Sequence, residues 1–138
     1  MKKKYLIVVA DYYKDIAKGL LDSSLKLIPK SSSIKIIRVP GVFEIPVTIS
    51  KNIKRYDAFL ALGCVIKGQT PHFHFISQAS TNAIMDLSIL NKKPIGNGII
   101  TCLNMKQAKD RKKKGAEAAE AVNSVLSQKW KLILIQRI

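Results

Sequence analysis

Cysteine is scarce in this sequence. The 138 residues include only Cys64 and Cys102, and each lies in an apolar run that is typical of a buried strand. A buried free cysteine behaves as a small apolar residue, and two such residues do not make the disulfide framework of a small secreted protein. We therefore expect a fold that an ordinary apolar core stabilises.

Clusters of metal-binding side chains are also missing. The two histidines, His72 and His74, are two positions apart, which places them on different faces of a helix. Because no cysteine or carboxylate cluster lies near them in the sequence, we do not expect a metal site. We interpret His74 as a packed or interface residue.

Long apolar runs and low-complexity linkers are absent from the sequence. Residues 5–10 form an apolar run that is too short to span a membrane, and no small-residue cleavage site follows it. We therefore expect a cytoplasmic protein with no membrane partner. Since no linker or internal repeat interrupts the chain, residues 1–138 are predicted to form a single domain with room for a proper core.

Acidic residues are few: 9 stand against 24 lysines and arginines, which gives a formal net charge of +15. Nucleic-acid binding is one reading of such a charge. However, the lysines are scattered over predicted helix faces and loops, with small clusters at 2–4 and 111–114, and aromatic residues do not regularly interleave with them. We favour solvated surface lysines that attract an anionic small substrate, and no nucleic-acid partner.

Short apolar runs alternate with longer stretches of helical spacing, which is the pattern of βαβ units. Right-handed crossovers between the strands then give an α/β fold with a four-stranded parallel sheet and helices on both faces. Residues 130–138 are too apolar for us to expect them to stay exposed to solvent. The predicted strands are 4–10, 34–39, 59–66 and 95–102; the predicted helices are 16–28, 43–53 with Pro46 in the first turn, 71–90, a short one opened by a capping box of Asn104 and Gln107, and 116–128.

Residues 60–76 combine a buried strand, a glycine loop and a helix start. Gly68 loosens the backbone, Thr70 is a good N-cap, and Pro71 suits the first helical position. A helix N-terminus just past the carboxyl end of a parallel strand favours an anion such as phosphate. His72 lies in that first turn, so it is a candidate proton carrier.

The loops after the four predicted strands meet at one edge of the sheet. They bring together an aromatic pair at Tyr12 and Tyr13, the carboxylate of Glu44, the loop before the third helix, and His72. Such a set resembles a pocket for a flat polar ring and a phosphate.

Two motifs in these loops resemble those of the lumazine synthase family. Residues 39–46 read VPGVFEIP, similar to the family's VPGAFEIP, and residues 61–73 read ALGCVIKGQTPHF, similar to LGxVIRGxTxHF. Later segments agree in order: IGNGIIT at 95–101, QAKDR at 107–111, and a Lys-Gly pair at 114–115 before an alanine-rich helix. The resemblance covers nearly the whole chain and implies a flavodoxin-like three-layer αβα sandwich.

The resemblance implies an enzyme of riboflavin biosynthesis that needs no cofactor or metal. It condenses 5-amino-6-ribitylaminouracil with 3,4-dihydroxy-2-butanone 4-phosphate to 6,7-dimethyl-8-ribityllumazine, phosphate and water. His72 matches the proton-transferring histidine of the family, and Tyr12 matches an aromatic that stacks on the pyrimidine. The other implied residues are Val42, Phe43, Glu44, Cys64, Val65, Ile66 and Asn97 for the pyrimidine and ribityl chain, and Gln69, Thr70, Arg111 and Lys114 for the phosphate.

The resemblance also implies a homo-oligomer, a pentamer whose sites lie between adjacent subunits, with the segments around Asn97 and Arg111 coming from the neighbour. This sequence departs from many members in three places. Asp11 reverses a local charge before Tyr12, Asn97 replaces a phenylalanine, and the connection 111–115 is short. The short connection favours an isolated pentamer or a small multiple of it.

Two other functions share parts of this pattern. A non-catalytic module that binds a flavin, a lumazine or a nucleotide would have the same fold and pocket, and fold alone does not separate it from the enzyme. A basic nucleic-acid-binding protein would share only the charge.

Overall fold

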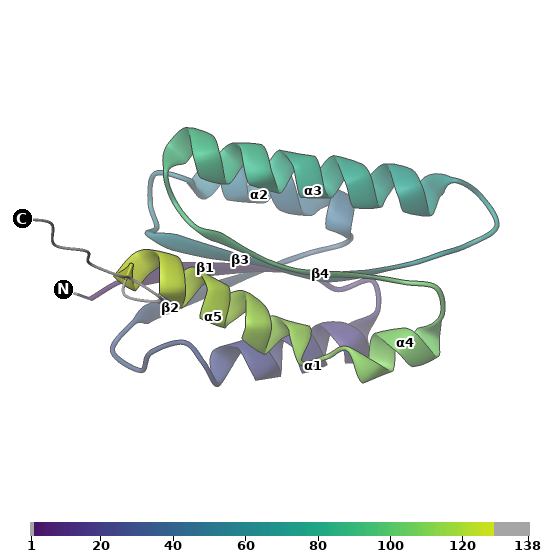
Figure 1. Ribbon diagram of the computed structural model, residues 1–138, viewed down its shortest axis with the longest axis horizontal. Coiled ribbons are helices and arrows are strands. Elements are labelled where there is room, and N and C mark those ends of the chain that lie inside the picture. The colour runs from purple at the N-terminus through teal and green to yellow at the C-terminus, as the bar shows by residue number, and fades with distance from the viewer. Residues whose placement is uncertain (1, 129–138) are drawn as a thin grey trace, which may run out of the picture.

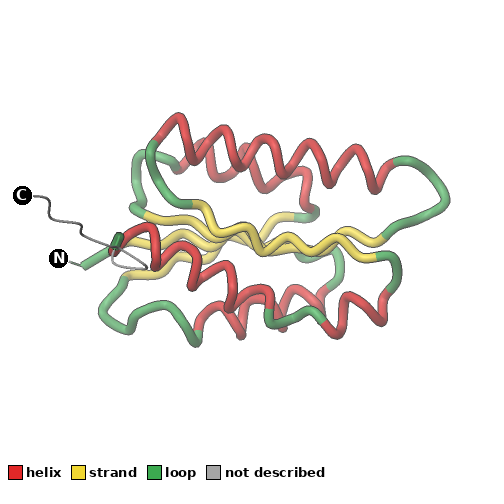
Figure 2. Tube along the Cα trace, viewed as in Figure 1, coloured by secondary structure: helices red, strands yellow, loops and turns green. Residues whose placement is uncertain are grey.

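The computed structural model describes residues 2–128, and the apolar segment 130–138 lies outside the described residues. Four parallel strands form one sheet in the order β2-β1-β3-β4. Helices α1, α4 and α5 cover one face of this sheet, and α2 and α3 cover the other (Figures 1 and 2). The elements are β1 (Lys4–Ala10), α1 (Lys14–Leu25), β2 (Ser33–Val39), the 3-10 helix η1 (Val42–Glu44), α2 (Ile45–Asn52), β3 (Ala58–Ile66), α3 (His72–Asn91), β4 (Ile95–Cys102), α4 (Met105–Asp110) and α5 (Lys114–Ser127).

The order of the strands and the two helical layers confirm the predicted flavodoxin-like three-layer αβα sandwich with a four-stranded parallel sheet. Strand β3 is buried on both faces, as its unbroken apolar run predicts. Leu60 and Leu62 pack in the core beside α1 and α5, whereas Phe59 and Ala61 pack in the core beside α2 and α3. The central strand therefore joins both cores.

Most element boundaries lie within a residue or two of those predicted from the sequence. Helix α1 is an exception, because it ends at Leu25 whereas the prediction extended it to Ile28. Ile28 precedes a proline, which disfavours helical backbone, yet its side chain still packs in the core at 5% exposure. The apolar spacing thus identified a buried residue correctly but assigned it to the wrong element.

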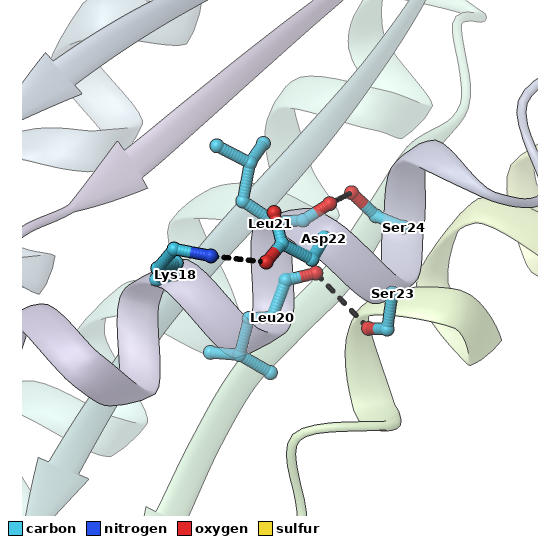
Figure 3. A network of polar contacts seen from close by, with 6 residues as sticks. All are labelled: Lys18, Leu20, Leu21, Asp22, Ser23 and Ser24. Atoms are coloured by element: carbon cyan, nitrogen blue, oxygen red, sulfur yellow. Dashed lines mark hydrogen bonds and ion pairs between the residues drawn. The ribbon is translucent and has the colours of Figure 1, made fainter.

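The start of α5 is fixed against α1. The Ser23 hydroxyl lies 2.8 Å from the carbonyl oxygen of Lys112, to which it donates, and it accepts a hydrogen bond from the amide of Ala116 at 3.2 Å. Figure 3 shows Ser23 beside Leu20 on α1, and a Cβ at Gly115 would overlap the Leu20 carbonyl oxygen. This close contact needs glycine, and it sets the position of the α4–α5 connection.

None of the helices described in residues 2–128 is both long enough and apolar enough to cross a membrane.

Candidate active site

A hollow of about 630 Å³ lies at the carboxyl ends of β1 and β3, between η1 and the first turns of α3. This is the edge of a parallel α/β sheet where ligands bind. Its lining is mainly apolar and aromatic, with one carboxylate and one imidazole. The lining residues are Tyr12, Tyr13, Gly41, Val42, Phe43, Glu44, Cys64, Val65, Ile66, His72 and Ile76.

The side chain of Glu44 holds the loop after β2 in a fixed conformation. One carboxylate oxygen of Glu44 accepts a hydrogen bond from the Gly41 amide at 3.0 Å, and the Glu44 amide donates to the Gly41 carbonyl at 3.2 Å. This reciprocal pairing holds η1 in place and leaves the second carboxylate oxygen to accept a hydrogen bond from a ligand. Phe43 is 68% exposed and is held at the rim of the hollow.

Gly63 brings the two sequence motifs into contact. A Cβ at this position on β3 would lie 2.8 Å from Cγ2 of Val42 and 3.1 Å from the Cβ of Ala10. Both distances are shorter than an ordinary contact between carbon atoms. The glycine therefore lets η1 approach the central strand, which places Phe43 and Glu44 over the hollow.

Tyr12 projects from the loop after β1 with 75% of its surface exposed. The rings of Tyr12 and Tyr13 pack edge to face, with their centroids 4.9 Å apart. The preceding Asp11 accepts a hydrogen bond from Arg38 of β2 at 2.9 Å, and its amide donates to the Val39 carbonyl at 2.9 Å. The Asp11 carboxylate, for which the sequence indicated no role, thus anchors to β2 the tyrosine loop, which carries Tyr12 and Tyr13.

Cys64 forms part of the floor of the hollow. Burial, and next the neighbouring Cys102, raise the pKa of its thiol to about 12. The thiol is consequently neutral near pH 7 and acts as an apolar surface rather than as a nucleophile. Burial, and next the nearby Tyr12, also raise the pKa of Tyr13.

His72 is the first residue of α3, and its side chain is exposed on the wall of the hollow. Its amide donates to the Thr70 hydroxyl at 3.4 Å. The helix begins one residue later than predicted, because Pro71 takes the capping position. The loop residues Gln69 and Thr70 are exposed beside this N-terminus, where free amides and the helix dipole favour an anion.

A second hollow of about 600 Å³ lies along the outer side of β4, next to α4 and α5. Asn97, Arg111 and Lys114 line it. The side-chain oxygen Oδ1 of Asn97 accepts a hydrogen bond from the Ile99 amide at 3.0 Å, and the Arg111 guanidinium donates to the Thr101 carbonyl at 3.4 Å. Basic side chains gather here on a strand edge that no other strand of residues 2–128 covers.

The structure therefore divides the predicted site residues into two groups. Tyr12, His72 and the predicted residues of η1 and β3 come together in the first hollow, whereas Asn97, Arg111 and Lys114 line the second one. Gln69 and Thr70 are in the loop before α3 and line neither hollow. Sequence reasoning missed Arg38, whose partner is 27 positions away, and Ile76. The position of Ile76, one helical turn after His72, is a signal that could have found it.

Comparisons with known proteins agree with this arrangement. A sequence profile of the 6,7-dimethyl-8-ribityllumazine synthase family matches residues 2–129. The chain belongs to this family. Similar curated relatives include the 6,7-dimethyl-8-ribityllumazine synthases of Bartonella tribocorum, 41% identical over 94% of this chain and 93% of the relative, and of Cutibacterium acnes, 39% identical over 90% and 80%. The 6,7-dimethyl-8-ribityllumazine synthase 1 of Rhodopseudomonas palustris is 40% identical over 94% of this chain and 87% of the relative.

Membership of the lumazine synthase family confirms the resemblance drawn from the two motifs. In the structure those motifs meet at Gly63 and Val42 and together form most of the first hollow. The two strongest sequence signals of the family therefore coincide with one physical site.

Proposed function

We propose that this chain is a 6,7-dimethyl-8-ribityllumazine synthase. It condenses 5-amino-6-ribitylaminouracil with 3,4-dihydroxy-2-butanone 4-phosphate and releases phosphate and water. The observation that carries the proposal is the 630 Å³ hollow at the carboxyl ends of β1 and β3, which residues of both family motifs line. Its size is in the range of small-molecule sites.

The pyrimidine substrate occupies the first hollow in this proposal. Tyr12 stacks on the ring, Val65 and Ile66 line its edge, and Phe43 and Glu44 hold the ribityl chain. The free carboxylate oxygen of Glu44 accepts hydrogen bonds from hydroxyl groups, while Cys64 provides an apolar wall. Holding one reactant against the other removes part of the entropic barrier, on the order of 7 kcal/mol or more in good cases.

His72 carries protons in this reaction. The amine condenses with the ketone to an imine, phosphate leaves, and the ring closes with loss of water, so every step moves a proton. An imidazole titrates near neutrality, and His72 lies on the wall of the hollow beside the anion-binding helix start. That position suits transfer of a proton between the substrate and the departing groups.

The phosphate binds at Gln69 and Thr70, where the N-terminus of the twenty-residue helix α3 supplies amides and a favourable dipole. Arg111 completes this site from a neighbouring copy, since its planar guanidinium suits a bidentate phosphate contact, and Lys114 adds a second positive charge. The net charge of +15 attracts the anionic substrate over a longer range.

We further propose a homopentamer in which the second hollow of one copy meets the first hollow of the next. The separation of Asn97, Arg111 and Lys114 from the other site residues supports this assembly. Apolar side chains exposed along α2 and α3 also support burial against other copies. They are Val47, Phe75, Met85, Ile89 and Leu90, each more than half exposed.

We expect the enzyme to work in the cytoplasm as one domain spanning residues 1–138. The two cysteines are free and buried, which suits a reducing compartment.

The test mixes the purified protein with both substrates and follows the fluorescence of the lumazine product. His72→Ala is expected to lower kcat about 10²-fold or more. Arg111→Ala is expected mainly to raise KM for the phosphate substrate. His74→Ala is the matched control, because His74 is exposed on the same helix but does not line the hollow.

Circular dichroism and light scattering on the same samples show whether each variant keeps its fold and mass. Equal kinetics for the His72 and His74 variants would contradict the assigned proton carrier. An intact wild-type assembly that makes no product would favour a non-catalytic binding module of the same fold.

A further inference from the structure

Tyr13 lines the first hollow but has no role in the proposed reaction. Its side chain borders the hollow beside Tyr12 and Cys64. Its hydroxyl makes no hydrogen bond to another group within residues 2–128. A phenol that borders a binding hollow with its donor and its acceptor both unused can form hydrogen bonds with a ligand.

The ring of Tyr13 is held in a fixed position. It is half buried and packs against the core beside α1 and α5, whereas Tyr12 is 75% exposed. Tyr13 also caps the N-terminus of α1, where its carbonyl accepts a hydrogen bond from the Ala17 amide at 2.9 Å. The hydroxyl therefore has little conformational freedom left to lose when a ligand binds.

The orientation of Tyr13 excludes a second stacking surface for the pyrimidine. The planes of the Tyr12 and Tyr13 rings make an angle of 81°. A pyrimidine stacked on Tyr12 is parallel to that ring, so it is nearly perpendicular to the ring of Tyr13. Because perpendicular rings do not stack face to face, the specific contribution of Tyr13 is its hydroxyl.

Tyr13 and Glu44 lie on opposite sides of the strand ends. Tyr13 packs against the core beside α1 and α5, whereas Val42, which begins η1, belongs to the core beside α2 and α3. Figure 1 shows these two helical layers on opposite faces of the sheet. The free carboxylate oxygen of Glu44 only accepts hydrogen bonds, and a phenol donates them. A ligand across the strand ends therefore meets an acceptor on one side and a donor on the other.

The groups of the pyrimidine substrate match this division. Its ribityl hydroxyls donate to Glu44, whereas its two ring carbonyl oxygens only accept and so need a donor. The lining side chains that carry a donor are Tyr12, Tyr13, Cys64 and His72. Tyr12 provides its ring face, His72 transfers protons, and the thiol of Cys64 is a weak donor. Tyr13 is thus the side chain left to donate to a ring carbonyl.

Burial keeps this donor protonated. Desolvation, and next the nearby Tyr12 and Cys64, raise the pKa of the Tyr13 phenol above its ordinary value of 10.0. The group is consequently neutral near pH 7 and keeps its proton in mildly alkaline solution.

We propose that Tyr13 is a specificity-determining residue whose hydroxyl donates a hydrogen bond to a ring carbonyl oxygen of the pyrimidine substrate. The inference rests on the proposed function. A site built to hydrogen-bond a polar group rejects an analogue that lacks this group. Tyr13 thus selects a uracil-type ring over flat rings without an acceptor at that position.

Binding of 6-ribitylaminouracil, measured by isothermal titration calorimetry, tests the proposal. This compound lacks the 5-amino group that forms the imine, so it binds without reacting. Tyr13→Phe keeps the ring and removes the hydroxyl, and its Kd is expected to rise about tenfold. Tyr56→Phe is the matched control, because Tyr56 lies just before β3, at the end of the strand away from the hollow, and packs against Phe59. Equal Kd values for the two variants would overturn the proposal.

Thiocarbonyl analogues test whether the hydroxyl donates to a ring carbonyl, and to which one. Sulfur accepts hydrogen bonds weakly, so either the 2-thio or the 4-thio analogue of 6-ribitylaminouracil should bind the wild type less tightly than the parent compound. For that analogue, the ratio of its Kd to that of the parent is expected to be about tenfold smaller in Tyr13→Phe, because the effect of the larger sulfur atom is common to both proteins and cancels. Equal ratios in the two proteins for both analogues would overturn the donor role.

Steady-state kinetics separate this inference from the proposed function. A hydrogen bond made in the ground state and in the transition state alike changes KM and leaves kcat nearly unchanged. Tyr13→Phe is therefore expected to raise KM for the pyrimidine substrate about tenfold, with kcat and KM for the phosphate substrate within about twofold of the wild type. An unchanged KM for the pyrimidine would overturn the inference and leave the proposed function intact. A wild type that binds no 6-ribitylaminouracil and forms no lumazine would overturn both.

Discussion

Replacing Gly63 by alanine tests whether the contact between the two family motifs shapes the site. The added Cβ would lie 2.8 Å from Cγ2 of Val42 and 3.1 Å from the Cβ of Ala10. Ordinary carbon contacts are about 3.5–4.0 Å, so η1 must move outward by several tenths of an ångström. Overpacking of this kind lowers the free energy of unfolding by about 1–3 kcal/mol.

The displacement should also change binding, because η1 carries Phe43 and Glu44. We expect KM for the pyrimidine substrate to rise. Stability is measured by urea denaturation at one protein concentration, with the midpoint falling by roughly 1 M for a typical urea slope. The double variant Gly63→Ala with Val42→Ala removes the clashing methyl group, so its loss of stability should be smaller than the sum of the two single losses.

Gly68→Ala is the matched control, since no described atom lies within 4 Å of the added Cβ and no glycine among residues 2–128 has a positive φ. This substitution should leave the free energy of unfolding unchanged or raise it by up to about 1 kcal/mol. If Gly63→Ala were as stable as Gly68→Ala and bound substrate normally, the close approach of η1 to β3 would not matter for the site.

Further predictions concern Cys64 and the tyrosine loop. Because the pKa of the Cys64 thiol is about 12 instead of 9.0, its thiolate fraction at pH 8 is about 1000-fold lower, so iodoacetamide should label it far more slowly in the native protein than in urea. The protonated thiol stabilises the folded state fully below pH 9, and this contribution is lost as pH rises from 9.0 to about 12. Urea titrations should therefore show that the free energy of unfolding falls less between pH 9 and about 12 in Cys64→Ala than in the wild type. Asp11→Asn removes an exposed ion pair with Arg38, so it should lower the free energy of unfolding by at most about 1 kcal/mol. It should also raise KM for the pyrimidine substrate, because Tyr12 is then held less firmly. An unchanged KM would show that the ion pair does not position Tyr12.

The sheet was predictable because its strands have unambiguous sequences. The run from Ala58 to Ile66 is apolar at both alternating sets of positions, which is typical of a strand buried on both faces. The end of α1 was less predictable, because Ile28 keeps the apolar spacing of the helix although it lies outside it. Spacing reports which residues are buried, and a local signal such as the following proline is needed to locate the boundary.

The site was predictable where its residues follow strands directly. Loops after parallel strands meet at one edge, so Tyr12, Glu44 and His72 were expected to lie together, and they line one hollow. The pairing of Asp11 with Arg38 was not predictable, because neither residue belongs to a pattern and their contact depends on the register of β1 and β2. The position of Arg111 away from this hollow follows from the fold of one chain, in which β4 lies at an edge of the sheet.

Subunit complementation tests most directly whether lumazine forms at a site that two copies share. His72→Ala and Arg111→Ala chains are refolded together in equal amounts. Lumazine formation is compared with that of each variant alone at a phosphate-substrate concentration far below the KM of the Arg111→Ala variant, where each variant alone is expected to be nearly inactive. In a ring of randomly mixed copies, about one site in four joins an intact His72 to a neighbour's intact Arg111, so the mixture should recover up to about a quarter of wild-type activity. Activity no higher than the average of the two separate variants, in assemblies that light scattering proves to be mixed, would contradict a shared site.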